Sequence, residues 1–203
     1  MSEHAILFSG EMVRAILEGR KTQTRRVIKD VPEHITHIEY IPSDFDEPFE
    51  FLFTRDDHIS GFWDKCPYGR IGDRLWVKET WRMLPGAENI SMPFNSVFSY
   101  AADWSEKEAK VIGPWKSSRF MPREASRITL EIVRVRVERV QEITGSDCYW
   151  EGVGSPYTGG GAKTWQEGQR KLYQDLWNKI NAKRGFGWDV NPWVWVIEFK
   201  KVV

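Results

Sequence analysis

Residues 19–26 combine four cations and two hydroxyls within eight positions, in the order Gly-Arg-Lys-Thr-Gln-Thr-Arg-Arg. Lys21 stands among three arginines, and neighbouring like charges lower the pKa of a lysine because they disfavour its protonated form. A lysine tuned in this way can act as a base, a nucleophile or an anion clamp. The same spacing also describes a basic surface turn in which Lys21 is fully solvated, and spacing by itself favours that alternative.

A short helix must bring this segment into place. Ser9 can cap the start of such a helix, and Gly19 can adopt the left-handed conformation that ends one. Between them an apolar stripe recurs at helical spacing, formed by Met12, Val13, Ile16 and Leu17. Because glycine ends the helix, we expect Lys21 and the residues after it to continue in extended or turn structure.

Alternation along this extended segment would separate its chemical groups. Lys21, Gln23 and Arg25 would share one face of the segment, unless the chain turns. Thr22 and Thr24 would then share the opposite face. The sequence therefore predicts that the two hydroxyls point away from Lys21 and Arg25.

Two further stretches carry side chains that suit a nucleotide site. Glu151 ends a short predicted helix that begins at Thr144. It could serve as an acid or base partner for Lys21, although taken alone it fits an ordinary surface glutamate. Trp76 lies on a predicted strand over residues 74–81 and could stack on a base. Most of the eleven tryptophans should nevertheless lie in the core, because they recur at strand or helix spacing.

The composition describes a folded chain without an overall electrostatic bias. The 203 residues are 41% hydrophobic and 14% aromatic, more than a disordered chain carries. The formal net charge is zero, so no overall field attracts nucleic acid or a membrane. Charge is nevertheless segregated, because residues 11–29 carry six Lys or Arg against two Glu, whereas residues 30–64 carry ten Asp or Glu against one Arg. Solubility is the safest interpretation of the acidic segment.

Neither the cysteines nor the histidines suggest a metal centre. Cys66 and Cys148 lack the spacing of a zinc site or a disulfide framework, and the carboxylates around His34 and His37 are scattered. The sequence shows no signal-peptide region and no apolar run of membrane-spanning length. We therefore expect a cytoplasmic protein with reduced thiols and without a metal, a cofactor or a membrane partner. The sequence does not predict an oligomeric state.

The longest predicted strand covers residues 127–140 and must bend. Its apolar side chains change parity between Ile132 and Val133, and a straight strand cannot bury both sets on one face. A bulge at that point would reconcile them, as strongly curved small barrels require. The alternative is a strand that is buried on both faces in turn. Residues 193–199 are apolar on both faces at first, as expected of a central or barrel-closing strand.

A longer helix and two insertions complete the predicted architecture. A capping box at Thr164 and Glu167 predicts the start of the helix. Its inward face would consist of Trp165, Leu172, Leu176 and Ile180. Residues 30–68 and 82–118 are predicted to be large loop insertions, the second with a short strand near Tyr100 and Trp104. The whole chain is then one domain over residues 1–203 of the α+β class, a small curved β-barrel with flanking helices and two large loop insertions.

Residues 16–26 resemble the signature of the ASCH domain family, which belongs to the PUA-like superfamily. That signature commonly reads Gly-x-Lys-x-x-Glu-x-Arg, and Gly19 and Lys21 match its first two positions. Thr24 stands where the Glu is usual, and Arg26 falls on the final Arg. Thr24 nevertheless matches small hydrolases of the family, which carry Gly-Arg-Lys-Thr-x-Thr.

The resemblance extends over nearly the whole chain. Residues 72–77 are similar to the family's turn into its next barrel strand, and residues 193–199 are similar to its closing strand. The wider pattern is similar to phage and prophage ASCH-like proteins and is carried by Phe8-Ser9-Gly10, Cys66-Pro67-Tyr68-Gly69, Met121-Pro122-Arg123 and Asn191-Pro192-Trp193-Val194-Trp195. The resemblance implies a PUA-like barrel with a cleft between barrel and helix, where family members recognise RNA and modified nucleotides.

The resemblance also implies an activity. Small bacterial members of the family hydrolyse N4-acetylcytidine with a Lys, a Thr and a Glu, which fall here on Lys21, Thr24 and Glu151. Lys21 would activate Thr24 or water, and Glu151 would pass the proton to the leaving amine. The implied nucleotide or RNA contacts are Arg25, Arg26, Arg74, Trp76 and Lys78.

The resemblance therefore implies an amidohydrolase that acts on N4-acylated cytidine-type nucleosides, with a nucleoside or RNA as its partner. The first alternative is a non-catalytic RNA or modified-base binding module of phage or prophage origin. Such a module would use the basic segment and the aromatic side chains for salt-sensitive binding. A nuclease is a weaker alternative, because the sequence offers no persuasive cluster of metal-binding carboxylates.

Overall fold

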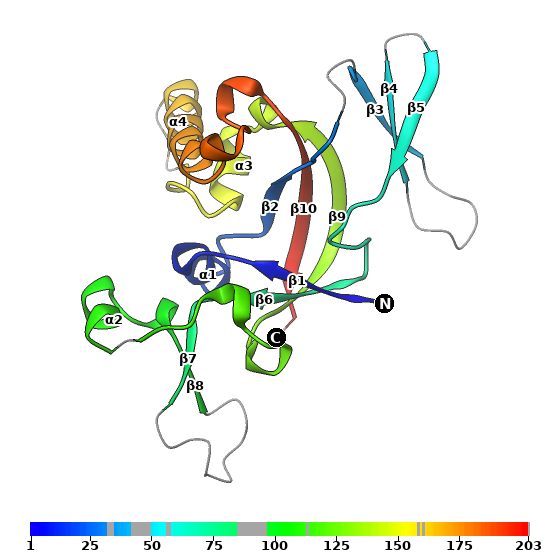
Figure 1. Ribbon diagram of the computed structural model, residues 1–203. Helices are drawn as coiled ribbons and strands as arrows, with labels where there is room; N and C mark the ends of the chain where they lie inside the picture. Colours follow the sequence, from blue (N-terminus) through cyan, green and yellow to red (C-terminus); the bar gives the residue numbers. More distant parts are fainter. Residues whose placement is uncertain are drawn as a thin grey trace.

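The computed structural model describes residues 1–31, 35–41, 50–55, 58–84, 97–112, 114–157, 159 and 161–202. A five-stranded mixed sheet lies at the centre of the molecule, in the strand order β1-β6-β9-β10-β2 (Figure 1). Its strands are β1 (Glu3–Leu7), β2 (Gln23–Val27), β6 (Arg74–Lys78), β9 (Thr129–Arg139) and β10 (Trp193–Lys201). β1 pairs with β6 in parallel, and the other neighbours are antiparallel.

The sheet curves but does not close, which corrects the prediction of a β-barrel. β1 and β2 form its two edges and are not paired with each other. A side chain spans the gap instead, because Arg26 Nη2 on β2 donates a hydrogen bond to the Leu7 carbonyl at the end of β1, 2.7 Å away. Residues of both edges line a cleft. The gap between β1 and β2 therefore borders a cleft. Hydrogen-bonded pairing of these two strands would close that gap.

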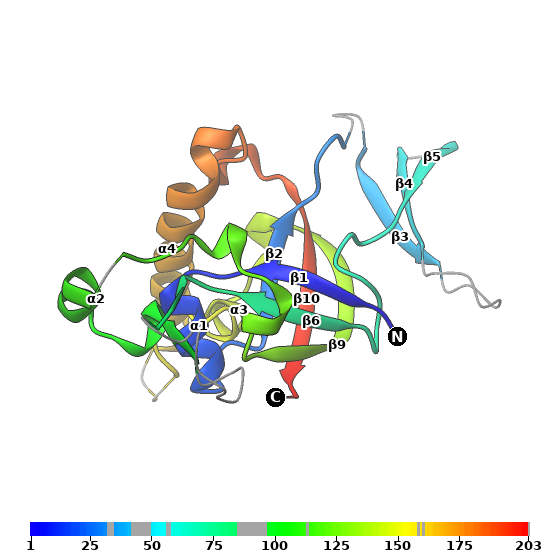
Figure 2. The ribbon, with the colours of Figure 1, turned by 60° about the horizontal axis from the view of Figure 1, so that its bottom comes forward.

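Helices α1 (Gly10–Leu17), α3 (Gly145–Trp150) and α4 (Ala162–Asn181) pack around the sheet. Figures 1 and 2 both show α3 and α4 on one side of β2 and β10. The ends of α1 confirm the sequence prediction. The Ser9 side chain accepts a hydrogen bond from the backbone N–H of Met12, and Gly19 takes a φ of +73° after the last turn. The basic segment therefore follows α1 directly after Gly19, as the sequence predicts.

β9 contains the predicted bulge. Glu198 and Phe199 of β10 oppose Arg134 and Ile132 of β9, so that Val133 has no partner in the ladder. The extra residue restores the parity of the apolar side chains, and those on both sides of the bulge reach the same core cluster.

β10 is buried on both faces, as its sequence predicts. Val196 packs in a cluster with Tyr173 and Trp177 of α4. Trp195 and Ile197 point to the opposite face and join the main core with residues of β1, β6 and α1. A central strand covered on both sides accounts for its continuous apolar run.

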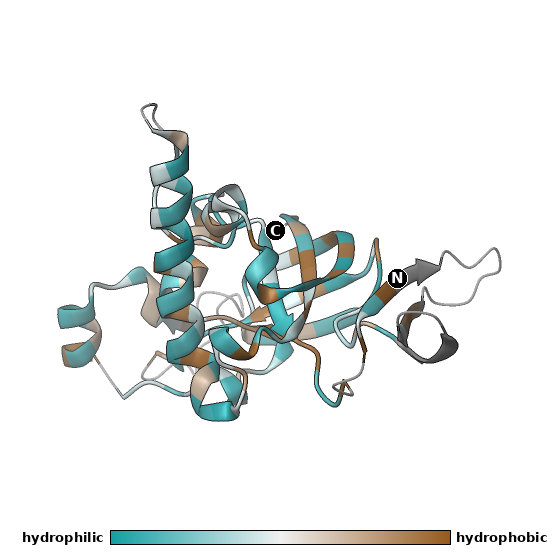
Figure 3. Ribbon diagram, turned by 90° about the horizontal axis from the view of Figure 1, so that it is seen from above, coloured by the Kyte–Doolittle hydropathy of each residue, from teal (hydrophilic) through white to brown (hydrophobic). Residues whose placement is uncertain are grey.

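α4 corrects the prediction for its start and for its inward face. It begins at Ala162, so Thr164 lies inside the helix and does not cap it. Its buried positions are Gln169, Tyr173, Trp177 and Asn181. The predicted inward residues Leu172 and Ile180 are 50% and 46% exposed, and Figure 3 shows mostly hydrophilic residues along α4. The buried face is rotated by one residue, about 100°, because two large aromatic rings bury more apolar surface than leucines do.

Both insertions contain more regular structure than the predicted loops, and the short strand predicted near Tyr100 is confirmed. The first carries an antiparallel sheet of β3 (His37–Ile41), β4 (Glu50–Arg55) and β5 (His58–Asp64), which projects from the body in Figures 1 and 2. The second carries the pair β7 (Trp81–Met83) and β8 (Phe98–Tyr100), followed by α2 (Glu106–Ile112). Short 3₁₀ helices occupy Ala101–Asp103, Ser118–Phe120, Arg123–Ala125, Val140–Glu142, Ala182–Arg184 and Trp188–Val190.

Several predictions concerned what the chain lacks. No described helix is long and apolar enough to cross a membrane. Within the described ranges, His, Cys, Asp and Glu form no group of three or more that could hold a metal, and His34 lies outside those ranges. Cys66 and Cys148 are free thiols. Burial raises the pKa of the Cys148 thiol to about 12, so it stays protonated at neutral pH.

Candidate functional site

The two faces of β2 carry different chemistry. In its pairing with β10, Gln23 lies opposite Glu198 and Arg25 opposite Val196, whereas Thr24 lies opposite Ile197. Because directly paired residues share a face of the sheet, Gln23 and Arg25 point to the same side and Thr24 points to the other. The predicted separation of Thr24 from Gln23 and Arg25 is confirmed here, whereas Arg26 lies on the Thr24 side.

Lys21 is a buried and fully hydrogen-bonded cation. Its Nζ donates to the Gln23 carbonyl, the Glu151 carbonyl and Glu151 Oε2, each at 2.8 Å. These three bonds use all three protons of the ammonium group. Burial lowers the pKa of Lys21, Glu151 opposes that shift, and the neighbouring arginines add only smaller effects. The direction matches the sequence prediction, but burial rather than like charge is its main cause.

Arg25 ties β2 to two other elements. Its Nη1 donates to Glu151 Oε1 at 3.3 Å, and its Nη2 lies 2.9 Å from Glu138 Oε2 and 3.5 Å from Asp147 Oδ2. Burial alone would lower the pKa of Arg25, but these carboxylates raise it overall. The Arg25 Nε has no hydrogen-bond partner. The guanidinium is therefore largely committed to the protein, which leaves little of it for an anionic ligand.

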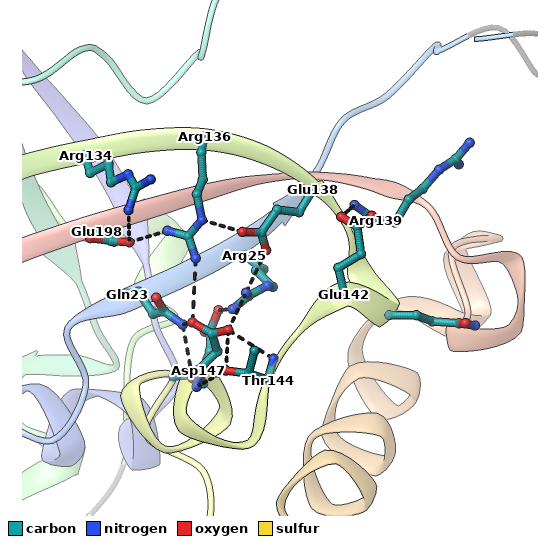
Figure 4. A network of polar contacts seen from close by, with 12 residues as sticks. Gln23, Arg25, Arg134, Arg136, Glu138, Arg139, Glu142, Thr144, Asp147 and Glu198 are labelled. Carbon is teal, nitrogen blue, oxygen red and sulfur yellow. Dashed lines mark hydrogen bonds and ion pairs between the residues drawn. The ribbon is translucent and has the colours of Figure 1, made fainter. Parts of the chain in front are cut away.

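A network of paired charges continues from Arg25 across the sheet (Figure 4). Arg136 contacts Glu138 and Glu198 and lies 3.6 Å from Asp147. The cations of this network are Lys21, Arg25, Arg134 and Arg136, and its carboxylates are Glu138, Asp147, Glu151 and Glu198. We call these eight residues the charged layer. Cations and carboxylates are equal in number, as buried charges require.

Asp147 connects the charged layer to α3. Its carboxylate accepts from the Thr144 backbone and hydroxyl at the start of α3, and Gln23 Nε2 donates to it at 3.0 Å. Burial would raise the pKa of Asp147, but these hydrogen bonds and Arg25 lower it overall. The cap of α3 and the charge network are thus one structure, which fixes where Glu151 follows the helix.

A cleft opens at the outer edge of β2. Its volume is about 590 Å³, within the range typical of small-ligand sites. The end of β1, the start of α1, β2, Tyr68 and the last three turns of α4 line it. Thr24, Arg25, Arg26 and Glu151 reach this cleft, whereas Lys21 does not. Glu151 therefore belongs to both regions: its carboxylate borders the cleft, and Lys21 holds it from behind.

Three buried polar side chains of the cleft lack a protein partner. Thr24, Tyr173 and Asn181 are each at most 6% exposed. Among the described residues, neither hydroxyl makes a hydrogen bond, and Asn181 uses only its Oδ1, which accepts from Arg184 Nη1 at 3.2 Å. Burial keeps the pKa of Tyr173 well above its ordinary value, so its hydroxyl remains a donor. None of these polar atoms is fully enclosed without a partner, so each stays open to a ligand in the cleft.

Aromatic rings and a half-buried cation form the opposite wall. The Arg26 guanidinium lies 5.1 Å from the centre of the Phe8 ring and 6.0 Å from that of Tyr68. Burial lowers the pKa of Arg26, and within the described part of the chain it contacts no carboxylate. Its Nε also lacks a partner. This wall combines flat apolar surface with an uncompensated charge.

The structure places the remaining predicted residues elsewhere. Arg74, Trp76 and Lys78 lie on β6 and do not line the cleft. Lys78 Nζ donates to the Arg119 carbonyl at 2.6 Å and sits 5.3 Å from the centre of the Trp76 ring, with Arg123 at 5.9 Å. The cleft thus gathers Thr24, Glu151 and the arginines of β2, and β6 forms a separate surface.

Sequence reasoning missed the contribution of α4. Tyr173 and Asn181 stand at positions i and i+8 with Trp177 between them, which is one helix face. That spacing was a usable signal, but the leucines of the neighbouring face suggested a different orientation. Leu176 and Ile180, which were predicted to be core, line the cleft instead.

Comparisons with known proteins return little. No family model matches the chain, and no curated protein matches it. Among solved structures, the chain is similar to the ASCH domain from Lactobacillus crispatus JV V101, with 13% sequence identity and a TM-score of 0.39, covering 99% of this chain and 80% of that chain. Both values are low, so the function must be argued from the geometry of the site.

Proposed function

We propose that the protein is an amidohydrolase that acts on an N4-acylated cytidine-type nucleoside in the cleft beside β2. The observation that carries the proposal is the meeting of Thr24 and Glu151 in one cleft of nucleoside size, with Lys21 bound to Glu151 from behind. Phe8 and Tyr68 offer apolar ring surface for a base. Hydrolysis would add water to the acyl carbon, break the bond to N4, and release a carboxylic acid and the free amine.

The contacts favour water as the nucleophile. Within the described residues, Thr24 makes no hydrogen bond to Lys21 or Glu151, so neither group removes its proton directly. A water held between the Thr24 hydroxyl and the Glu151 carboxylate would give its proton to Glu151 as it attacks. Glu151 would then pass that proton to the leaving nitrogen. Lys21 keeps its three hydrogen bonds throughout and fixes the carboxylate in position.

The reaction also requires a hydrogen-bond donor for the acyl oxygen, and Tyr173 would supply it. Negative charge develops on the acyl oxygen during attack, and a preorganised donor stabilises it. The Tyr173 hydroxyl is buried, remains protonated and has no partner in the described chain. It lines the same cleft as Thr24 and Glu151, which supports a role beside them. We assign it the role of hydrogen-bond donor to the acyl oxygen.

The test is direct. Purified protein is incubated with N4-acetylcytidine, and released cytidine is followed by chromatography. We expect turnover by the wild type and a loss of about 10²-fold in Thr24→Val, which keeps the shape and removes the hydroxyl. Thr22→Val is the matched control, because Thr22 is exposed and lies outside the cleft. Absence of cytidine release at high concentrations of folded wild type would refute the proposal for this substrate.

A second candidate function rests on the surface of β6. There Trp76 has two cations near its ring, Lys78 and Arg123. Aromatic stacking on a base and cationic contact with phosphate are how single-stranded nucleic acid is bound without chemistry. In this case labelled RNA would bind in a salt-sensitive manner, and Trp76→Ala would weaken binding. Equal binding by wild type and Trp76→Ala would remove this candidate.

A further inference from the structure

The cleft carries more positive charge than its protein surroundings neutralise. Four cations line it, and Glu151 is the only carboxylate that does so among the described residues. Arg25 is neutralised by the charged layer. The other three, Arg26, Lys29 and Arg184, form no ion pair within the described part of the chain. By contrast, Arg127 on another surface is paired with both Glu79 and Asp103.

These free cations extend away from the proposed reaction centre. Tyr173 and Asn181 are eight residues apart on α4, which corresponds to about 12 Å along the helix axis. At one end of this helix segment, Tyr173 interacts with Glu151. At the other end, Asn181 accepts a hydrogen bond from Arg184. Arg26 lines the same cleft, with its guanidinium 5.1 Å from the centre of the Phe8 ring. The cleft is therefore polarised, with the carboxylate at one end and unpaired cations toward the other.

We propose that the ligand of this cleft is a phosphorylated nucleotide rather than a free nucleoside, with its phosphate held by Arg26, Lys29 and Arg184. The proposal rests on the proposed function for the placement of the base and acyl group at the Glu151 end. A guanidinium binds phosphate oxygens through paired hydrogen bonds. The free amide nitrogen of Asn181 adds a neutral donor beside them. The same phosphate could belong to a free nucleotide or to the terminal nucleotide of an RNA.

The experiment measures binding without turnover. Isothermal titration with cytidine and with cytidine 5′-monophosphate, which carry no acyl group to hydrolyse, gives the effect of the phosphate alone. We expect the nucleotide to bind at least about tenfold more tightly, as one charge-assisted contact allows. The advantage should shrink as salt is raised, because exposed charges are screened. A short oligoribonucleotide with a 5′-phosphorylated terminal cytidine distinguishes an RNA end from the free nucleotide.

Two substitutions locate the phosphate, and one serves as their control. Arg184→Ala and Lys29→Ala should each remove most of the preference for the nucleotide and leave cytidine binding within about twofold of the wild type. Lys183→Ala is the control, because Lys183 lies in the same 3₁₀ turn, is exposed and does not line the cleft. It should keep the full preference.

The outcomes separate this inference from the proposed function. Equal affinity for cytidine and its monophosphate overturns the inference, even if N4-acetylcytidine is hydrolysed. A clear preference for the monophosphate without any hydrolysis supports the inference and removes the hydrolase. A preference that survives both Arg184→Ala and Lys29→Ala shows that the phosphate binds elsewhere and also overturns it. Binding of neither compound overturns the inference, whereas the hydrolase is judged separately by the release of cytidine from N4-acetylcytidine.

Discussion

The charged layer and the cleft meet at β2, where Arg25 and Glu151 belong to both, and they differ in how their polar groups are satisfied. In the charged layer, four cations face four carboxylates, and Lys21 uses all three of its protons. In the cleft, Thr24 and Tyr173 keep unpaired hydroxyls and three cations lack a carboxylate among the described residues. A satisfied network holds a structure together, whereas unsatisfied buried groups indicate a ligand.

The Glu151 carboxylate is shared by the two regions. One carboxylate oxygen is bound by Lys21 and the other by Arg25, yet the same group borders the cleft. Fixing a carboxylate on the protein side leaves its reactive edge in a constant position. We therefore expect substitutions in the charged layer to lower stability and substitutions in the cleft to lower activity. Substitution of Glu151 should lower both.

Glu151→Gln should give the largest effect. It leaves the Lys21 ammonium buried without its counter-charge, which costs about 3–5 kcal/mol of unfolding free energy. It also removes the proposed base and should lower hydrolysis by at least about 10²-fold. Urea unfolding followed by tryptophan fluorescence measures the first effect. Glu167→Gln, at an exposed position of α4, is the control, and unchanged stability in Glu151→Gln would mean that the pair is solvated.

Tyr173→Phe should separate activity from stability. Removing one donor to a developing oxyanion costs about 10²–10³-fold in kcat. The folded protein should lose less than about 1 kcal/mol, because the removed hydroxyl has no partner in the described chain. A thermal melt together with kcat and KM for N4-acetylcytidine tests both statements. A large fall in melting temperature would show that the hydroxyl is structural.

Asp147→Asn should act on stability alone and in a pH-dependent way. The pKa of Asp147 is lower in the folded protein than its ordinary 3.8, so its contribution is fully present above that value and is lost as pH falls through the lower folded pKa. We expect a loss of about 1–2 kcal/mol at pH 7. The difference from wild type should fade below about pH 3.8 in urea titrations across pH. A constant difference would contradict the assignment.

Trp76→Ala should give the smallest effect on hydrolysis. Trp76 lies on β6 outside the cleft, so turnover of N4-acetylcytidine should stay within about twofold of wild type. The same variant should weaken RNA binding if the surface of β6 is the functional one. Lost hydrolysis with intact folding would mean that substrate also contacts β6 and that the two surfaces act together.

Local features of the fold were predictable because they depend on neighbouring residues. The cap at Ser9, the left-handed Gly19 and the bulge at Val133 each follow from steric rules or side-chain parity. The open sheet was not predictable, because closure depends on what fills the gap between β1 and β2. The orientation of α4 was also missed, since two faces one residue apart were both apolar and only packing chose between them.

The site divides in the same way. The sequence alone determined that Lys21, Gln23 and Arg25 share one side of an extended segment and that Thr24 faces the other, because alternation is a local property of a strand. Only the tertiary structure decided that the first side meets carboxylates of β9, β10 and α3, and that α4 covers this same side by packing on Val196 opposite Arg25. Those partners come from residues more than 100 positions away, and burial, which also sets the pKa of Lys21, exists only once the elements have packed.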